Sequence, residues 1–283
     1  MRNSSYYTNH LGIKVEFNTP NSPYTCNPIA LRSFSTTAAV LSNKITAFTN
    51  EEIKSYNIEL GIKGKNREET ADNYDYLISI FETDTLASEP GMLTVNGYSL
   101  KCYINGFDII TSLNCAKIVA ATVTSDTNCW YKELFTMLFT SDFSIVLDSE
   151  PITYQIKEYP HGYPLGYPTE LAVKEINNPA LRPTHFRLIF EGPVYSPTVI
   201  IGGHTYAVNT NVEKGESLII DSRAKTITRI VNGEKINEFS KRNRESYVFE
   251  KIPLGINRVS YSNDIQKFFI TLIDERSYPK WKI

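Results

Sequence analysis

The sequence predicts two domains, an α+β N-terminal domain over residues 1–157 and an all-β sandwich over residues 158–283. Three observations predict this fold class. The chain has 283 residues, more than the roughly 100 to 200 of a usual single domain. Only the first half contains a convincing helical pattern, and short segments of alternating polar and apolar residues dominate elsewhere. A Tyr/Pro/Gly-rich run separates the two halves.

Strands and one long helix account for the first half. Residues 13–17 and 56–62 alternate as half-buried strands do. Asn66 then caps a helix, and Glu69, three positions later, completes a capping box. The helix is expected to pack one apolar face against a sheet, and that face consists of Tyr74, Leu77, Ile78 and Phe81.

A hairpin is predicted after the helix. Residues 92–95 and 98–104 flank Asn96-Gly97, the pair that best suits a type I′ turn. Residues 116–123 and 143–147 are two further strand candidates. The N-terminal domain is therefore expected to be mostly antiparallel sheet with one helix.

The domain boundary is placed at residues 158–168, since a run this rich in proline enters neither a helix interior nor a central strand. Short strand candidates recur after it, and Gly202-Gly203 and Asn232-Gly233 supply hairpin turns. The candidates are residues 186–190, 198–201, 205–208, 217–220, 226–231, 247–249 and 268–272. This spacing is typical of an antiparallel β-sandwich.

Ordered motifs in both halves resemble one known family. The first half has Pro90-Gly91-Met92-Leu93, Asn96-Gly97-Tyr98 and then Cys102 to Gly106. The second half has Gly215 to Ser222 (GESLIIDS), the Asn232-Gly233 turn, Asn237-Glu238-Phe239 and Ile252 to Asn257 (IPLGIN). In order and spacing these residues resemble the distal tail proteins (Dit) of siphophages, whose C-terminal domain is a galectin-like β-sandwich. Gly202, Gly203, Gly215, Gly233 and Gly255 are expected at turn positions with positive φ, and Asp221-Ser222 at an Asx turn.

The resemblance implies a structural role in the tip of a bacteriophage tail. It implies a hexameric ring of N-terminal domains around a channel, through which DNA passes without specific binding. The ring would join the tail tube protein to the tail-tip or tape-measure proteins and to the receptor-binding proteins of a baseplate. Such a ring is built from two different faces of each subunit and exposed strand edges. The protein would be part of the virion, assembled in the cytoplasm of the bacterial host, which agrees with an N-terminus that lacks the layout of a secretory signal.

Charge is distributed unevenly between the halves. Residues 1–157 carry 12 Lys+Arg against 17 Asp+Glu, a net −5, and residues 158–283 carry 17 against 14, a net +3. We hypothesise that part of the acidic excess lines the channel and repels DNA. The candidates are Asp72, Asp75, Glu82, Asp84, Glu89 and Asp108. The alternative is that the helix carboxylates only solvate its exposed face.

No catalytic, cofactor-binding or metal-binding residue is predicted, and the protein is expected not to be an enzyme. Cys26, Cys102, Cys115 and Cys129 have no CxxC spacing and are interpreted as buried thiols. His161, His185 and His204 have no metal-spaced partners, and pairs among carboxylates such as Asp126, Asp148 and Glu150 occur in any acidic chain. No segment reaches the roughly 20 apolar residues of a membrane span.

The alternative function is a carbohydrate-binding, lectin-like adhesin that recognises a cell-surface glycan. Galactoside-binding members of the galectin fold use a His-x-Asn-x-Arg strand and a tryptophan, whereas here Thr205 to Val208 follow His204. The tyrosines of residues 159–167 remain available to stack on a sugar. The basic run at residues 241–244 has no aromatic platform beside it in the sequence, which weakens a nucleic-acid interpretation. Trp281 is expected to fold back onto its own domain or onto the seam between domains.

Overall fold

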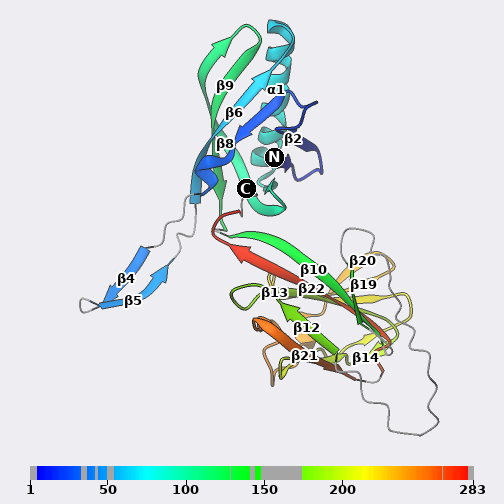
Figure 1. Ribbon diagram of the computed structural model, residues 1–283. Helices are drawn as coiled ribbons and strands as arrows, with labels where there is room; N and C mark the ends of the chain where they lie inside the picture. The colour runs from blue at the N-terminus through cyan, green and yellow to red at the C-terminus, as the bar shows by residue number, and fades with distance from the viewer. Residues whose placement is uncertain are drawn as a thin grey trace, which may run out of the picture. The chain divides into compact units, whose positions relative to one another are not determined.

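The computed structural model describes residues 5–32, 37–41, 44–49, 54–127, 129–140, 144–147, 174–262 and 264–279. The chain divides into two compact units (Figure 1). Unit 1 comprises residues 1–132 and 275–283, and unit 2 comprises residues 133–274. The division therefore falls between Lys132 and Glu133. The predicted boundary at residues 158–168 lies outside the described residues, and so does Trp281.

Seven antiparallel strands of unit 1 pair in one continuous order. The order is β2 (Lys14–Phe17), β1 (Ser5–Thr8), β7 (Gly91–Val95), β8 (Tyr98–Leu113), β9 (Ala116–Ser125), β6 (Lys54–Lys63) and β3 (Tyr24–Asn27). With 16 residues, β8 is long enough to pair with β7 through its first part and with β9 through the remainder. Asn96 and Gly97 have φ of 52° and 81° between β7 and β8, which confirms the predicted turn with two positive φ values.

Asn18 links the two ends of this strand order. It follows β2 directly, and its Nδ2 donates to the carbonyl oxygen of Cys26 in β3 at 2.9 Å, while the Cys26 N–H donates to its Oδ1 at 3.2 Å. The Asn18 side chain thus forms hydrogen bonds with the N–H and carbonyl groups of Cys26, which an edge strand would otherwise expose. The expected open strand edges are therefore partly closed within the subunit.

Helix α1 (Arg67–Ala87) packs against β8, β6 and β9. Its predicted cap is confirmed, since Asn66 Oδ1 accepts from the Glu69 N–H at 2.8 Å. The Glu69 carboxylate accepts from the N–H of Lys65 at 2.6 Å, one residue before the cap. The buried face contains Thr70, Leu77, Ile80, Phe81 and Asp84, whereas the predicted Tyr74 and Ile78 are only half-buried.

Asp84 is a fully buried carboxylate in the last turn of α1. It accepts from Tyr7 Oη at 2.5 Å and from the His10 N–H at 2.9 Å, and its Oδ1 lies 2.6 Å from His10 Nδ1. The carboxylate is placed near the negative end of the helix dipole, so these contacts must offset an unfavourable position. Gly91 completes the cluster, because a Cβ there would collide with the Tyr7 hydroxyl and with Asp84 Oδ2.

Two smaller elements complete unit 1. The 3-10 helix η1 (Pro28–Arg32) buries Leu31 in the core. Strands β4 (Thr37–Leu41) and β5 (Lys44–Thr49) pair only with each other among the described strands, as a two-stranded hairpin.

Unit 2 is connected to unit 1 through two neighbouring strands, β10 (Trp130–Thr140) and β22 (Lys267–Arg276), which lie side by side in Figure 1. They belong to a sheet that continues with β11 (Ser144–Leu147) beside β10 and with β13 (His185–Glu191), β18 (Ser217–Asp221), β19 (Thr226–Val231) and β20 (Glu234–Asn237) beyond β22. A second sheet has the order β12 (Lys174–Asn178), β21 (Gly255–Tyr261), β15 (Thr198–Ile201) and β16 (His204–Ala207). Unit 2 also contains β14 (Val194–Tyr195), which pairs with β17 (Asn211–Val212), and the 3-10 helix η2 (Phe239–Lys241).

Both sheets contribute to one hydrophobic core in unit 2. Phe268 of β22 is fully buried and stacks on Phe139 and Phe190 with ring centroids 5.0 and 5.7 Å apart. Tyr261 of the second sheet meets the same ring edge-on at 4.9 Å. An aromatic side chain therefore joins three strands of one sheet to the other sheet.

Most predicted turns of unit 2 are confirmed. All five glycines expected at positive φ have it, with values from 59° to 89°. Asp221 Oδ1 accepts from the N–H groups of Arg223 and Ala224 at 2.9 Å, as an Asx turn requires. The predicted strand at residues 247–249 is wrong, because Val248 and Phe249 are buried in a loop.

Candidate assembly surfaces

The sheet of β3, β6, β9 and β8 has two contrasting faces. One face buries Tyr56, Ile58 and Leu60 of β6 in the core of unit 1. The register places the intervening residues on the other face, and they are exposed or half-buried. This second face, called here the polar sheet face, includes Thr25, Asn27, Ser55, Asn57, Glu59, Asn105, Asp108, Thr111, Ala120, Thr122 and Thr124.

Hydroxyl and amide groups on the polar sheet face bond to one another across strands. Thr122 Oγ1 donates to Asn57 Oδ1 at 3.2 Å, and Thr124 Oγ1 donates to Asn105 Oδ1 at 3.1 Å. The Ser55 and Thr124 hydroxyls lie 3.4 Å apart. These contacts orient short, neutral polar side chains over the sheet.

The charged residues of the polar sheet face within these strands are few. Glu59 and Asp108 both lie opposite Ala120 in the strand register, one on each side of β9, and Lys63 is near the end of β6. Asp108 is thus one acidic residue of the predicted set on this face. The others belong to α1 or follow it, and Asp84 cannot line a channel because it is fully buried against Tyr7 and His10.

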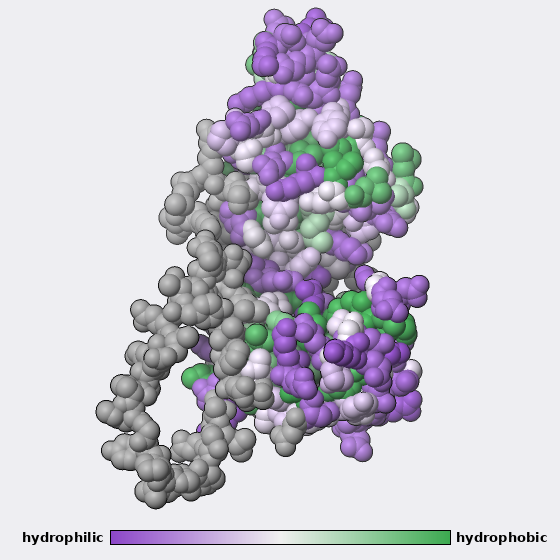
Figure 2. Space-filling model, turned by 90° about the vertical axis from the view of Figure 1, so that its right-hand side faces the viewer, coloured by the Kyte–Doolittle hydropathy of each residue, from purple (hydrophilic) through white to green (hydrophobic). Residues whose placement is uncertain are grey.

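Exposed apolar side chains gather at the far end of the β8–β9 hairpin. Ile109, Ile110, Leu113 and Ile118 are 50, 55, 64 and 41% exposed, and the register places Leu113 and Ile118 at the end of the polar sheet face. The β4–β5 hairpin presents a second group, with Val40, Leu41 and Ile45 at 61 to 70% exposure. Hydrophobic residues also reach the surface in patches among hydrophilic ones on the face drawn in Figure 2. Exposed apolar clusters with a polar surround mark protein contacts.

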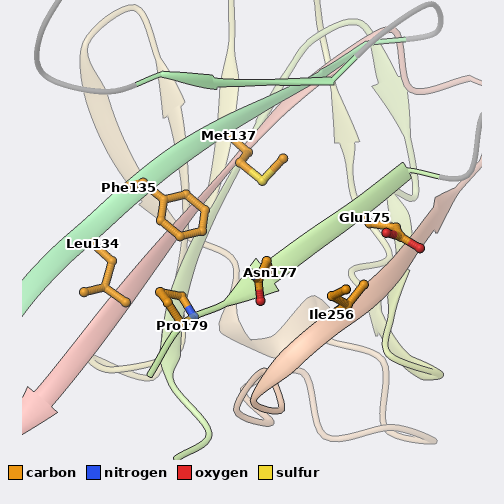
Figure 3. Close-up of a pocket in the computed structure, with 7 residues that line it drawn as sticks. All are labelled: Leu134, Phe135, Met137, Glu175, Asn177, Pro179 and Ile256. Atoms are coloured by element: carbon orange, nitrogen blue, oxygen red, sulfur yellow. The ribbon is translucent and has the colours of Figure 1, made fainter. Parts of the chain in front are cut away.

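A pocket of about 480 Å³ lies within unit 2 between β10 and β12 (Figure 3). Leu134, Phe135 and Met137 of β10 form one wall, and Asn177 of β12 and Ile256 of β21 face them. Glu175 and Pro179 complete the lining, so a single carboxylate accompanies mostly apolar side chains. The composition resembles that of a contact surface for an apolar chain segment and lacks a paired acid and base.

Ser222 and His185 of unit 2 have structural contacts. The buried Ser222 hydroxyl accepts from the Phe186 N–H at 2.8 Å and donates to the Phe186 carbonyl oxygen at 3.0 Å. His185 Nδ1 lies 3.1 Å from the same hydroxyl. The Ser222 hydroxyl thus connects the end of β18 to β13. Because its proton is donated to a backbone carbonyl oxygen, Ser222 and His185 lack the geometry of a nucleophile and its base.

The remaining candidate residues are dispersed. Asp126 is exposed, while His161, Asp148, Glu150 and the tyrosines at 159–167 lie outside the described residues. Among the residues with defined positions, no group of three or more His, Cys, Asp and Glu is arranged to hold a metal ion. No helix in the described ranges has the length and hydrophobicity to cross a membrane.

The four cysteines, all of them in described segments, form no disulfide. Cys26 and Cys102 are buried as predicted, and burial raises the pKa of both thiols to about 12, which keeps them protonated at neutral pH. The prediction is wrong for Cys115, which is exposed in the β8–β9 turn, and Cys129 is half-buried. A cysteine in a tight turn cannot be recognised as exposed from spacing alone.

No family model matches the sequence, and neither does any curated protein. Solved structures do match. A chain from the structure of the phage P2 baseplate in its activated conformation with Ca has a TM-score of 0.61 at 14% identity, covering 99% of this chain and 100% of that chain. The P2 baseplate with Sr gives the same values. The crystal structure of the SPP1 Dit protein, described as a paradigm of the hub adsorption apparatus in phages that infect Gram-positive bacteria, has a TM-score of 0.57 at 10% identity, covering 98% of this chain and 100% of that chain. At these identities the likeness shows a shared fold over almost the whole chain, and it confirms the predicted resemblance to Dit proteins at the level of fold.

Proposed function

We propose that this chain is a structural protein of a phage tail tip, a distal tail protein that forms a hexameric hub between the tail tube and the baseplate. The observation that carries the proposal is the whole-chain likeness to the SPP1 Dit hub protein, which spans both units without a missing part. The protein acts by assembly in this proposal and has no enzymatic role. Its place is the virion, after assembly in the cytoplasm of the host bacterium.

The polar sheet face of unit 1 is the surface that we assign to the channel. DNA carries a dense row of phosphates, and Lys or Arg side chains along its path would retain it by counterion release. The polar sheet face offers hydroxyls, amides and the carboxylates of Glu59 and Asp108. Its cations within the paired strands are Lys63 of β6 and Lys101 of β8, which the alternation of β8 places on the same side as Asn105. Such a lining lets DNA pass without specific binding. The acidic residues that we propose for the channel are therefore Glu59 and Asp108 of the sheet, in place of the candidates on α1.

The apolar groups of unit 1 are assigned to protein contacts. In a closed ring each subunit presents two different faces to its neighbours, and a stacked tail adds contacts above and below. The far end of the β8–β9 hairpin and the β4–β5 hairpin expose the side chains that such contacts need. Neighbouring copies and the tail tube protein are the partners that we propose for them.

Unit 2 is assigned to the periphery of the hub. Its two antiparallel sheets around one core agree with a galectin-like sandwich, and we propose that it contacts the tail-tip and receptor-binding proteins. The apolar pocket beside β12 is one surface available to them. We retain the ring-forming role for the first domain, now ending near Lys132.

The ring is tested by measuring the mass of the full chain, alone and mixed with its tail tube protein, by native mass spectrometry and particle imaging. We expect a closed ring of six 32.2 kDa subunits, with each interface burying more than about 1,000 Å². A species that stays monomeric or dimeric with the tube protein present would contradict the hub.

The channel assignment is tested by adding positive charge to the polar sheet face. The substitution Thr122→Lys places one lysine per subunit beside Asn57, and we expect it to slow DNA release from assembled particles by about tenfold or more, because six added cations attract phosphates. The matched control is Ser79→Lys on the exposed side of α1, with the same change of charge. Incorporation of both variants into particles is measured in parallel. Equal release rates for the two would remove the polar sheet face from the channel.

A further inference from the structure

An aromatic and basic cluster lies on the surface of unit 2, in the loop of residues 238–250 after β20. Phe249 is buried at its base, stacks on Phe239 with centroids 5.9 Å apart and meets Tyr247 edge-on at 5.8 Å. Phe239 and Tyr247 are 38 and 52% exposed. In the sequence the basic run at 241–244 follows Phe239 but has no aromatic platform, whereas in the fold Phe239, Tyr247 and Phe249 lie together beside it.

The backbone around Tyr247 is held in place by hydrogen bonds to β16. Ser246 Oγ donates to the Thr205 carbonyl oxygen at 2.8 Å, and the Asn243 N–H donates to the Ala207 carbonyl oxygen at 3.1 Å. His204 Nε2 lies 2.9 Å from the carbonyl oxygen of Tyr247 itself. A half-exposed ring on a fixed backbone loses little freedom on binding, which distinguishes this loop from an ordinary solvated turn.

The cationic side chains of the loop differ in what they contact. The Arg242 guanidinium lies 4.3 Å from the Phe239 ring centroid and donates to the Phe239 carbonyl oxygen, and Lys241 pairs with Glu238 at 3.8 Å. Arg244 is exposed, and within the described residues no hydrogen bond or ion pair engages its guanidinium. Arg244 therefore presents an exposed, planar set of donors three residues before Tyr247 in the same loop.

We propose that this cluster binds an acidic polysaccharide, with a pyranose ring stacked on Tyr247 and a carboxylate or phosphate group held by Arg244. The C–H face of a pyranose is apolar and packs on an aromatic ring, while its hydroxyl and acidic groups point sideways to planar donors. The site does not use the His-x-Asn-x-Arg residues that bind galactosides in galectins, which are missing after His204 in this chain. It also goes beyond the proposed hub function. It would give the tail tip its own contact with the cell surface.

Nucleic acid fits the cluster less well. Binding of a single strand uses successive stacking rings along a basic groove. Here Arg242 and Phe249 already contact the ring of Phe239, which leaves Tyr247 as the available ring of the loop. Glu245 and Glu250 accompany the cations, so the loop suits a sparsely charged polymer better than a dense polyphosphate.

The experiment is calorimetric titration of the full chain with three probes: hyaluronan hexasaccharide, which has one carboxylate per disaccharide, neutral chitohexaose, and a ten-residue oligothymidylate. We expect hyaluronan to bind more tightly than chitohexaose. Tyr247→Ala should weaken hyaluronan binding by about tenfold, the effect of losing one stacking ring, and Tyr247→Phe should restore it. Arg244→Gln should abolish the preference for the acidic sugar.

Matched controls separate the site from general surface effects. Tyr195→Ala removes a tyrosine that is 58% exposed elsewhere in unit 2, and Arg258→Gln removes an exposed arginine of β21; both should bind as the unaltered chain does. Absence of hyaluronan binding at millimolar concentration, equal binding of both sugars, or insensitivity to Tyr247→Ala would each overturn the proposal. If Tyr247→Ala weakened the binding of oligothymidylate but not of either sugar, the ligand of the cluster would be a nucleic acid and the proposal would be wrong. Ring assembly by the Tyr247→Ala variant tests the hub separately.

Discussion

Replacing Asp84 with alanine is expected to lower the free energy of unfolding of unit 1 by about 3 to 5 kcal/mol. The carboxylate is fully buried and holds the Tyr7 hydroxyl at 2.5 Å, the His10 N–H at 2.9 Å and His10 Nδ1 at 2.6 Å. Without it, the buried Tyr7 hydroxyl keeps only a 3.5 Å contact with the Cys102 carbonyl oxygen, and the partly buried His10 loses both of its contacts with the carboxylate. The variant should therefore loosen the attachment of the N-terminal strands to the end of α1.

The measurement is denaturant unfolding followed by the fluorescence of Trp130, which is fully buried in the core of unit 1. Asp75→Ala is the matched control, because Asp75 is an exposed carboxylate of the same helix and its loss should cost less than about 0.5 kcal/mol. Tyr7→Phe provides a second variant that keeps the ring and removes one bond. If Asp84→Ala and Asp75→Ala unfolded at the same denaturant concentration, the cluster would have no role in stability.

Replacing Phe268 with alanine is expected to destabilise unit 2 by about 3 to 5 kcal/mol, the usual cost of removing a fully buried phenylalanine. Its ring contacts Phe139, Phe190 and Tyr261 at centroid distances of 4.9 to 5.7 Å. Removing the ring would therefore leave a cavity in the core that the two sheets share. Hydrogen exchange of the amides of β13 and β21 measures the effect in each sheet directly.

Phe269→Ala is the control for Phe268→Ala. Phe269 is the next residue of β22, its ring is half-buried on the opposite face, and Lys267 Nζ lies 4.9 Å from its centroid. We expect a loss of less than half that of Phe268→Ala. Equal losses at the two positions would mean that the stacked rings are not the centre of the core.

Local patterns predicted the elements whose determinants are close in sequence. The capping residue Asn66 and the turn at Asn96-Gly97 depend on neighbours within four residues, and both are confirmed. Strand β21 was missed because Gly255, its first residue, was expected at a turn position. Residues 247–249 were predicted as a strand because a buried loop and a short strand have similar composition.

Features that depend on distant partners were beyond the sequence. Asp84 looked like a solvated helix residue, and only the approach of Tyr7, 77 positions away, shows it to be part of the core. The division into units between Lys132 and Glu133 also depends on distant partners, since β10 pairs with β22, whose position in the fold is set by long-range pairing. The polar sheet face follows from strand register, which alternation within one strand does not specify.

The return of the chain to unit 1 through β22 affects when the two units are completed during translation. The ribosome makes unit 2 in full before it reaches residues 275–279, of which Pro279 is buried and Arg276 lies over the Tyr98 ring at 5.8 Å. At that point unit 2 has all of its residues, while unit 1, which was begun first, still lacks its segment from Glu275 onward. Unit 1 therefore cannot be completed before unit 2 has been synthesised.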